Sequence, residues 1–348
     1  MASDDSPPVR RRRPRYPGRN PRRFHEKYKE LNPDRYQADV EKIIDSGKTP
    51  AGMHRAIMVD EVLAVLAPRP GEIAVDCTLG FGGHARALLA RIQPGGLLIG
   101  LDVDSIELRR TVDRLRMAGF REDIFRAHRS NFAGLPQVLA AEKLARADLI
   151  LADLGVSSMQ LDNPERGFTF KESGPLDMRM NPAHGETASH FLAHQTEHKL
   201  ARILEENADE PDARLIASAL KSRAIETTLD LRRRVREALE IARPAIDDGE
   251  VEKAVRRTFQ ALRIAVNDEF SALDTFLRQL PASLASGGRA AVLTFHSGED
   301  RRVKKAFDAG QRAGLYQAIA DEVARPTPAE IRANPRAAAA KLRWAVRA

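Results

Sequence analysis

The stretch Ile73-Ala-Val-Asp-Cys-Thr-Leu-Gly-Phe-Gly-Gly-His84 decides the fold of this chain. It predicts a short apolar strand over residues 73–75, a carboxylate at Asp76, a glycine-rich turn and a helix over residues 84–91. Glycine has no Cβ atom, so the backbone of this turn can bend sharply and approach a ligand closely. The first N–H groups of the helix lack intrahelical partners and can face that ligand. The stretch predicts a ligand-binding strand–turn–helix unit; the alternative is the same unit with a purely structural role.

The kind of ligand follows from the glycine spacing and from Asp76. The glycines fall as G-x-G-G over residues 80–83, so the third glycine of the dinucleotide motif G-x-G-x-x-G is missing. Asp76 would repel a pyrophosphate in a tight site, because like charges interact strongly there. S-adenosylmethionine suits the site better, since it has an α-amino group and a sulfonium and no phosphate. An NAD-linked dehydrogenase is therefore the weakest interpretation.

Short apolar segments alternate along the chain with segments of helical periodicity. This alternation is typical of an α/β fold with a doubly wound, mostly parallel sheet. Ligands of such sheets bind beyond the carboxyl ends of the strands. The predicted strands cover residues 73–75, 97–101, 123–127, 148–153 and 288–294. The side chains expected at that edge of the sheet are Asp76, Asp102, Phe132 and Asp153.

The alternation stops after the fourth predicted strand. Residues 187–239 have helical periodicity and no strand signal, which predicts an inserted all-helical domain that roofs the site. We expect a single helix over residues 259–280 before the last strand. The predicted division is a basic extension over residues 1–50, the α/β domain in two parts over 51–158 and 256–348, and the helical insertion over 159–255.

Three histidines of the insertion, His190, His194 and His198, recur at every fourth position. On one continuous helix they would share a face and could bind a metal ion. No cysteine or paired carboxylate completes such a site in the sequence. We therefore expect a solvated helix face and no metal.

The net charge of +7 is concentrated near the N-terminus. Eight arginines between Arg10 and Arg23 stand against two aspartates in the first 25 residues. This composition predicts a segment that is disordered when free and that binds the phosphates of a nucleic acid. A solubility tail is the alternative.

Other features of composition exclude several classes of protein. Cys77 is the single cysteine, so an intrachain disulfide is impossible. No run is long and apolar enough to cross a bilayer, and the N-terminus lacks a secretory signal. We expect a cytoplasmic protein without a membrane partner.

Two residues at strand ends are candidates for catalysis. Asp153 closes the fourth predicted strand, where enzymes that methylate an exocyclic amine place a short polar motif. Acceptors on the two N–H groups of such an amine localise its lone pair for attack on a sulfonium methyl group. Asp153 could offer one acceptor, face the methyl donor or simply cap the next turn. His296 follows the fifth predicted strand and could accept the released proton, although a structural histidine is an equal alternative.

Asp102 lies 26 residues after Asp76, close to the spacing at which an acidic residue meets a ribose in nucleotide-binding units. It could instead cap the helix that begins near Ser105, but Asp104 fits that role better.

A basic helix is expected after His296. Its first turns hold Arg301, Arg302, Lys304 and Lys305, where the helix dipole disfavours positive charge. This placement indicates an anionic partner or an ordinary charged surface.

Together these segments resemble the small-subunit ribosomal RNA cytidine-N4 methyltransferases, the RsmH (formerly MraW) family. The resemblance runs from about His54 to Arg343, and the number of motifs in one order makes it specific. The matching segments are residues 76–84, 153–162, 166–170, 174–180 and 258–264 with Asn267 and Glu269, then 295–297 with 299–301, and finally 334–336 and 341–343.

The resemblance implies a Rossmann-like methyltransferase fold with S-adenosylmethionine as donor. It implies a cytidine in the decoding (P-site) region of 16S rRNA as acceptor, within the small ribosomal subunit, and it allows a homodimer. The glycine turn would hold the methionine end, Asp102 the ribose hydroxyls, and Phe132 would lie near the adenine. The positions matching the donor site of the family are Gly82, Gly83, His84, Asp102, Phe132, Asp153 and Gln160.

The sequence departs from the family at several places. The N-terminal fifty residues are an addition, Gly298 replaces a usual leucine, and residues 207–210 replace a tyrosine-glycine-acidic motif. These departures affect contacts with the substrate and leave the donor site unchanged, so two alternative functions stay open. One is an amine methyltransferase for DNA or protein, and the other is a non-catalytic RNA-binding ribosome assembly factor.

Overall fold

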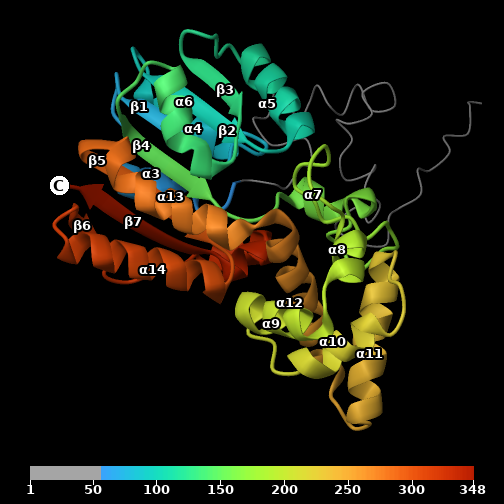
Figure 1. Ribbon diagram of the computed structural model, residues 1–348. Helices are drawn as coiled ribbons and strands as arrows, with labels where there is room; N and C mark the ends of the chain where they lie inside the picture. Colours follow the sequence, from blue (N-terminus) through green and yellow to red (C-terminus); the bar gives the residue numbers. More distant parts are fainter. Residues whose placement is uncertain (1–55) are drawn as a thin grey trace, which may run out of the picture. The chain divides into compact units, whose positions relative to one another are not determined.

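A seven-stranded sheet organises the chain in the computed structural model, which describes residues 56–348 (Figure 1). The strand order is β3-β2-β1-β4-β5-β7-β6; neighbours from β3 to β5 are parallel, whereas β7 is antiparallel to β5 and β6. The expected doubly wound, mostly parallel sheet is confirmed. The strands are β1 (Ile73–Asp76), β2 (Leu97–Asp102), β3 (Phe125–Arg129), β4 (Ala147–Asp153), β5 (Leu284–Thr294), β6 (Tyr316–Ile319) and β7 (Lys341–Arg347).

Alternate residues of the central strands enter two separate cores. In β1, Ala74 packs in one core and Val75 in the other, and Leu149 and Ile150 of β4 repeat this division. The division follows from the two-residue period of a strand, and helices make both faces apolar. One face is covered by α3 (Val59–Leu66), α4 (Gly83–Ile92) and α5 (Ser105–Met117), and the other by α6 (Leu135–Ala141), α13 (Glu269–Ser283) and α14 (Ser297–Arg312).

The segment between β4 and α13 has its own core. Its helices bury a third apolar cluster, which extends from Phe168 to Leu262. The described residues 159–255 contain no strand, in agreement with the expected all-helical insertion. The helices are α7 (Ser158–Asp162), α8 (Ala188–His194), α9 (Glu197–Ala208), α10 (Ala213–Lys221), α11 (Thr228–Ala242) and α12 (Asp248–Asn267). Short elements elsewhere are α15 (Pro328–Ala333) and the 3₁₀ turns η2 (Phe132–Gly134), η3 (Pro164–Arg166) and η4 (Pro335–Ala339).

The single helix expected over residues 259–280 is wrong, because the chain breaks between α12 and α13. Asp268 adopts a left-handed conformation with φ 49° and ends α12. Aspartate tolerates this conformation better than most residues, so no glycine or proline marks the break. The side chain of Asn267 bonds the backbone of Met178 and Met180 and also donates to the Arg263 carbonyl of its own helix.

The expected disorder of residues 1–50 concerns a segment outside the described residues. Within residues 56–348, no helix combines the length and the apolar character needed to cross a membrane.

Candidate active site

The glycine turn after β1 is held by β2 and α5. The N–H of Gly80 donates to Oδ2 of Asp102 at 2.8 Å, and the hydroxyl of Thr111 donates to the Gly80 carbonyl at 2.6 Å. Gly82 has φ 82°, and a Cβ atom there would lie 2.9 Å from the Thr111 methyl group. Only glycine therefore fits this position. The turn leads directly into α4, so the free N–H groups of that helix lie beside the strand ends.

Two carboxylates at the ends of β1 and β4 lack partners for one oxygen each. Asp76 is 1% exposed; its Oδ1 accepts from the Thr78 N–H at 3.1 Å, and its Oδ2 has no hydrogen-bond partner among residues 56–348. The Oδ1 atom of Asp153 is likewise buried without a partner in that range. The Thr78 hydroxyl accepts from the Asp153 N–H at 2.6 Å and so joins the two strand ends. Unpaired buried carboxylate oxygens are costly, which indicates that a cationic ligand belongs here.

The pKa values of Asp76 and Asp153 are raised by their burial and by neighbouring negative charges. Burial raises the pKa of Asp76 to about 6, and the charges of Asp153 and Asp102 add to that rise against the opposing effect of His84. Burial raises the pKa of Asp153 to about 7, with help from the negative charge of Glu299. Three of the predicted acidic residues are thus close enough to influence one another at one edge of the sheet.

His84 lies between this edge and the start of the described chain. Its Nε2 atom is 3.0 Å from the carbonyl of Ile57, which can only accept, so Nε2 carries a hydrogen. Its Nδ1 atom is 3.5 Å from Oδ2 of Asp153. Burial lowers the pKa of His84, although the nearby Asp76 opposes this. In neutral His84 the Nδ1 atom therefore has a lone pair that faces Oδ2 of Asp153. A proton on either of these two atoms would allow a hydrogen bond between them.

Asp102 and Asp104 form the acidic turn after β2. Asp102 accepts from Gly80 and from the Asp104 N–H at 2.8 Å each, which leaves part of its acceptor capacity for another donor. Burial raises the pKa of Asp102 to about 6, against the lowering effect of these two bonds. Asp104 caps α5 as expected, through bonds from the N–H groups of Ile106 and Glu107.

Asp104 also has a role that the sequence did not indicate. It is fully buried and accepts from Nε2 of Gln160 at 2.9 Å and from the guanidinium of Arg166 at 2.7 Å. Burial acts to raise the pKa of Asp104, but these bonds outweigh it and hold the pKa below its usual value. Arg166 donates further to the carbonyls of Arg179 and Met180. These bonds connect the end of β2, which carries Asp102, to the first part of the insertion.

Gln160 and Phe132 lie at the same edge of the sheet but in packed surroundings. The Gln160 side chain completes a capping box with Ser157 at the start of α7. Phe132 belongs to η2 and meets Phe276 of α13 edge to face, with ring centroids 5.6 Å apart. Their predicted contacts with the donor stay predictions.

His296 follows β5 and caps α14. Its Nδ1 accepts from the Glu299 N–H at 3.4 Å, and its Nε2 lies 3.2 Å from Oε1 of Glu299. Burial acts to raise the pKa of Glu299, but His296 and then Arg263 lower it overall. The histidine therefore has a structural hydrogen bond at Nδ1, whereas its buried Nε2 has no hydrogen-bond partner among residues 56–348. Its catalytic role stays a prediction. A Cβ atom on Gly298 would lie 2.6 Å from the ring of Phe270, so this phenylalanine fills the space next to α14.

The three histidines of the insertion do not share one helix. α8 ends at His194, and Thr196 caps α9, to which His198 belongs. The expectation of a common face is wrong, because the cap starts a new helix. His190 and His194 instead form an exposed group with Glu186, in which the possible ligand atoms lie within 4.8 Å of one another.

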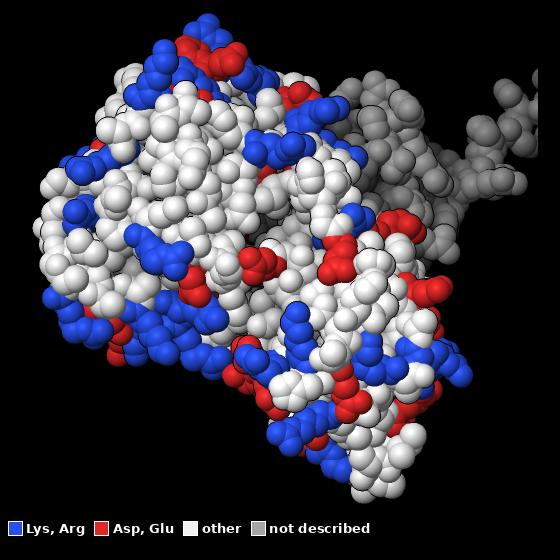
Figure 2. All heavy atoms as spheres, in the orientation of Figure 1, with Lys and Arg blue, Asp and Glu red and all other residues white. Residues whose placement is uncertain are grey.

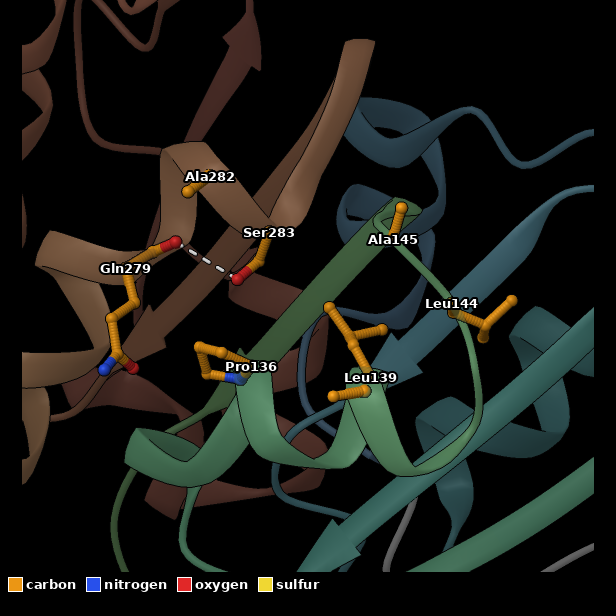
Figure 3. A pocket seen from close by; sticks show the side chains of 8 residues that line it. Pro136, Leu139, Leu144, Ala145, Gln279, Ala282 and Ser283 are labelled. Carbon is orange, nitrogen blue, oxygen red and sulfur yellow. Dashed lines mark hydrogen bonds between the residues drawn. The ribbon is translucent and has the colours of Figure 1, made fainter.

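A pocket lies at the other edge of the sheet, between α6 and α13 (Figure 3). Ala145 and Ser283 line it, and they come shortly before the starts of β4 and β5. This pocket is therefore at the amino ends of the strands and separate from the carboxylates. The remaining lining residues are Pro136, Leu139, Ala140, Leu144, Gln279 and Ala282.

Comparison with known proteins identifies the family of this chain. Residues 51–348 match the MraW methylase family. Ribosomal RNA small subunit methyltransferase H 2 of Alkaliphilus metalliredigens is 47% identical over 350 residues, with 99% of this chain and 100% of the relative covered. Ribosomal RNA small subunit methyltransferase H 1 of Agathobacter rectalis is 47% identical, with 97% of this chain and 98% of the relative covered. Among solved structures, TrmN from Thermus thermophilus is 14% identical with a TM-score of 0.38, covering 84% of this chain and 48% of that chain.

The family match begins at residue 51, so the first fifty residues lie outside it, as expected. The alignment with the Alkaliphilus relative covers 99% of the chain and therefore extends into this segment. A relative from Anaeromyxobacter sp. (strain K), 44% identical, covers 83% of this chain and 96% of its own length. The chain belongs to the MraW methylase family, and it is a methyltransferase that uses S-adenosylmethionine as its methyl donor.

Proposed function

We propose that this enzyme methylates the N4 amine of a cytidine in the decoding (P-site) region of 16S rRNA, within the small ribosomal subunit. The observation that carries the proposal is the meeting of Asp76 and Asp153 beside the glycine turn, each with a buried oxygen that has no partner among residues 56–348. Such a site suits a cationic donor next to a nucleobase amine. The names of the relatives support small-subunit ribosomal RNA as the acceptor.

The donor site would combine the turn with the acidic strand ends. The backbone of the glycine turn would hold the methionine end, and the carboxylates of Asp76 and Asp153 would lie near its ammonium group. Asp102 has acceptor capacity left for the ribose hydroxyls. We assign the donor contacts to Gly82, Gly83, His84, Asp102, Phe132, Asp153 and Gln160.

The chain's own groups would activate the cytosine amine. Bound S-adenosylmethionine supplies an electrophilic methyl group on a positively charged sulfur. The N4 lone pair is delocalised into the ring, so a carboxylate oxygen of Asp153 that accepts an N4–H bond would make the amine a better nucleophile. Asp153 can also take the proton that N4 releases, because its pKa of about 7 suits a general base at neutral pH. His296 is the second candidate for that proton.

The insertion would hold the RNA over the site. Its link to the donor side is the contact of Arg166 with Asp104, next to Asp102. We propose that residues 159–255 recognise the substrate while the α/β domain binds the donor.

A direct test is mass spectrometry of 16S rRNA nucleosides from a strain that lacks the gene. We expect N4-methylated cytidine to disappear at one position of the decoding region and to return with the wild-type gene, but not with the Asp153→Asn variant. Labelled methyl transfer by the purified enzyme to small subunits, naked 16S rRNA, DNA and protein separates the alternatives. Unchanged methylcytidine in the deletion strain would refute the proposed acceptor.

A further inference from the structure

The outer face of α14 is an unusually basic surface that begins next to the active site. α14 starts at Ser297, directly after His296 at the end of β5. Its buried residues Val303, Phe307 and Gly310 face the sheet. Figure 2 shows Lys and Arg side chains gathered over this helix.

The helix separates its charges by sign. Its two acidic residues in the first turn are buried: Glu299 lies beside His296, and Asp300 bonds Lys341 and Arg343. Four of the residues that follow, Arg301, Lys304, Lys305 and Arg312, are exposed and basic, and the remaining acidic residue, Asp308, is half-buried and forms no ion pair within 4 Å among residues 56–348. Arg301, Lys305 and Arg312 are spaced by four and seven residues, so they lie on one stripe opposite the buried face. That stripe spans about 17 Å at 1.5 Å per residue.

Most cations of this stripe form no ion pair among residues 56–348, unlike the arginines of α11. In α11, each of the arginines 232, 233, 234 and 236 has an acidic partner within 4 Å. Lys304, Lys305 and Arg312 are exposed, and none of them has such a partner among residues 56–348. Arg301 is the exception, since it pairs with Asp209. An ordinary solvated helix face mixes charges of both signs, as α11 does, so the unpaired cations favour an anionic partner.

We propose that the face formed by Lys304, Lys305 and Arg312, named here the α14 basic face, binds the phosphate backbone of the RNA substrate. The proposal rests on the proposed function and adds to it the surface along which the RNA leaves the active site. Phosphate contacts position a nucleic acid without reading its sequence. The α14 basic face would therefore set affinity and register, while the choice of the target base stays with the strand ends and the insertion.

The test is the binding of small ribosomal subunits, prepared from a strain that lacks the gene, and of naked 16S rRNA. The Lys305→Glu/Arg312→Glu variant is compared with Arg91→Glu/Arg146→Glu, which makes the same change of charge. Arg91 lies in the last turn of α4, which covers the other face of the sheet from α14, and Arg146 precedes β4; both control residues are exposed and outside the α14 basic face. Binding is measured by fluorescence anisotropy between 50 and 200 mM salt.

We expect the Lys305→Glu/Arg312→Glu variant to bind both RNAs at least tenfold more weakly at low salt. The slope of log affinity against log salt should fall by about two, one for each lost phosphate contact. The control variant should bind as the wild type does, and all three proteins should bind S-adenosylmethionine equally in calorimetry. Equal binding by both variants would overturn the proposal, as would weaker binding to subunits with an unchanged salt slope, because that result would indicate a ribosomal protein as the partner. If the wild type bound the RNA but transferred no methyl group to it, the proposed function would be refuted and the proposed binding surface would not, because the binding measurement does not depend on catalysis.

Discussion

Asp102 serves the donor site in two ways, because it holds the glycine turn through Gly80 and keeps acceptor capacity for the ribose. We expect Asp102→Ala to weaken S-adenosylmethionine binding by roughly 1–3 kcal/mol, the range for the loss of a hydrogen bond to a charged group. Asp102→Asn keeps one acceptor oxygen and should lose less. Isothermal titration calorimetry measures both variants, and an unchanged affinity of Asp102→Ala would show that the ribose is bound elsewhere.

Asp153 makes donor binding depend on pH. Its pKa is raised to about 7, and that of Asp76 to about 6, so the free site holds protons in mildly acidic solution. A cationic donor favours the ionised carboxylates, so binding must release a proton below pH 7. We expect the affinity to fall by up to about tenfold for each pH unit below 7, to fall more steeply below pH 6 where Asp76 also binds a proton, and to level off above pH 8.

Calorimetry in buffers of different ionisation enthalpy counts the released protons directly. At pH 6.5 the wild type should release a proton on binding, and Asp153→Asn should release fewer. His84 faces the same carboxylates, so His84→Gln serves as the variant that separates its titration from that of Asp153. Identical proton release in the wild type and in Asp153→Asn would contradict the assignment to Asp153.

At the scale of elements, the buried pair of Arg166 and Asp104 joins the end of β2 to the first part of the insertion. Asp104 is 0% exposed and the Arg166 side chain 15%. Arg166→Met would leave a buried charge without its partner, and we expect it to lower the free energy of unfolding by about 3–5 kcal/mol. Arg202→Met is the control, because its pair with Glu206 is about 60% exposed and should contribute under about 1 kcal/mol. Urea denaturation followed by circular dichroism measures both.

The contact between α13 and α14 explains the departure at Gly298. Phe270 occupies the space that a side chain at this position would need. We expect Gly298→Leu to destabilise the protein by about 1–3 kcal/mol through overpacking. Phe270→Ala in the same chain should recover part of that loss, so a double-mutant cycle should give a clear coupling energy. Additive effects of the two substitutions would mean that the side chains do not compete for the same space.

The elements that the sequence predicted well are those with a strong local pattern. The buried parallel strands are runs of apolar residues, and the cap at Asp104 is a local signal. β6 and β7 were missed, because β6 has only four residues and β7 mixes charged and apolar residues. The pairing of β7 with β5, which buries Arg343 against Asp300, depends on contacts that no local pattern reveals.

The candidate site likewise contains residues that the local sequence predicts and contacts that it does not. Residues at strand ends could be predicted, since parallel strands end at one edge of the sheet, and Asp76, Asp102 and Asp153 meet there. Contacts between distant segments could not. The bond from Arg166 to Asp104 spans 62 residues, and the bond from His84 to the Ile57 carbonyl depends on how the chain enters the sheet.

At the scale of the whole molecule, the insertion and the sheet have separate cores. Leu231 is fully buried in the insertion, and Leu231→Ala should destabilise its core by about 2–5 kcal/mol. Trp344, the single tryptophan, lies in β7 and reports on the sheet. We expect part of the helical circular-dichroism signal of this variant to be lost at a lower urea concentration than in the wild type. The urea midpoint of the Trp344 fluorescence transition should stay unchanged. A common shift of both signals would mean that the two cores unfold together.

The path of the chain between β4 and β5 has a consequence for how such enzymes diversify. A parallel neighbour needs only one crossover helix, and α13 already returns the chain to the start of β5. The sheet topology would therefore be complete without the residues between α7 and α12. We expect that replacement of this segment would change the methyl acceptor and leave the donor-binding domain as it is. The connections at α7 and α13 are the places where a replacement segment should be joined.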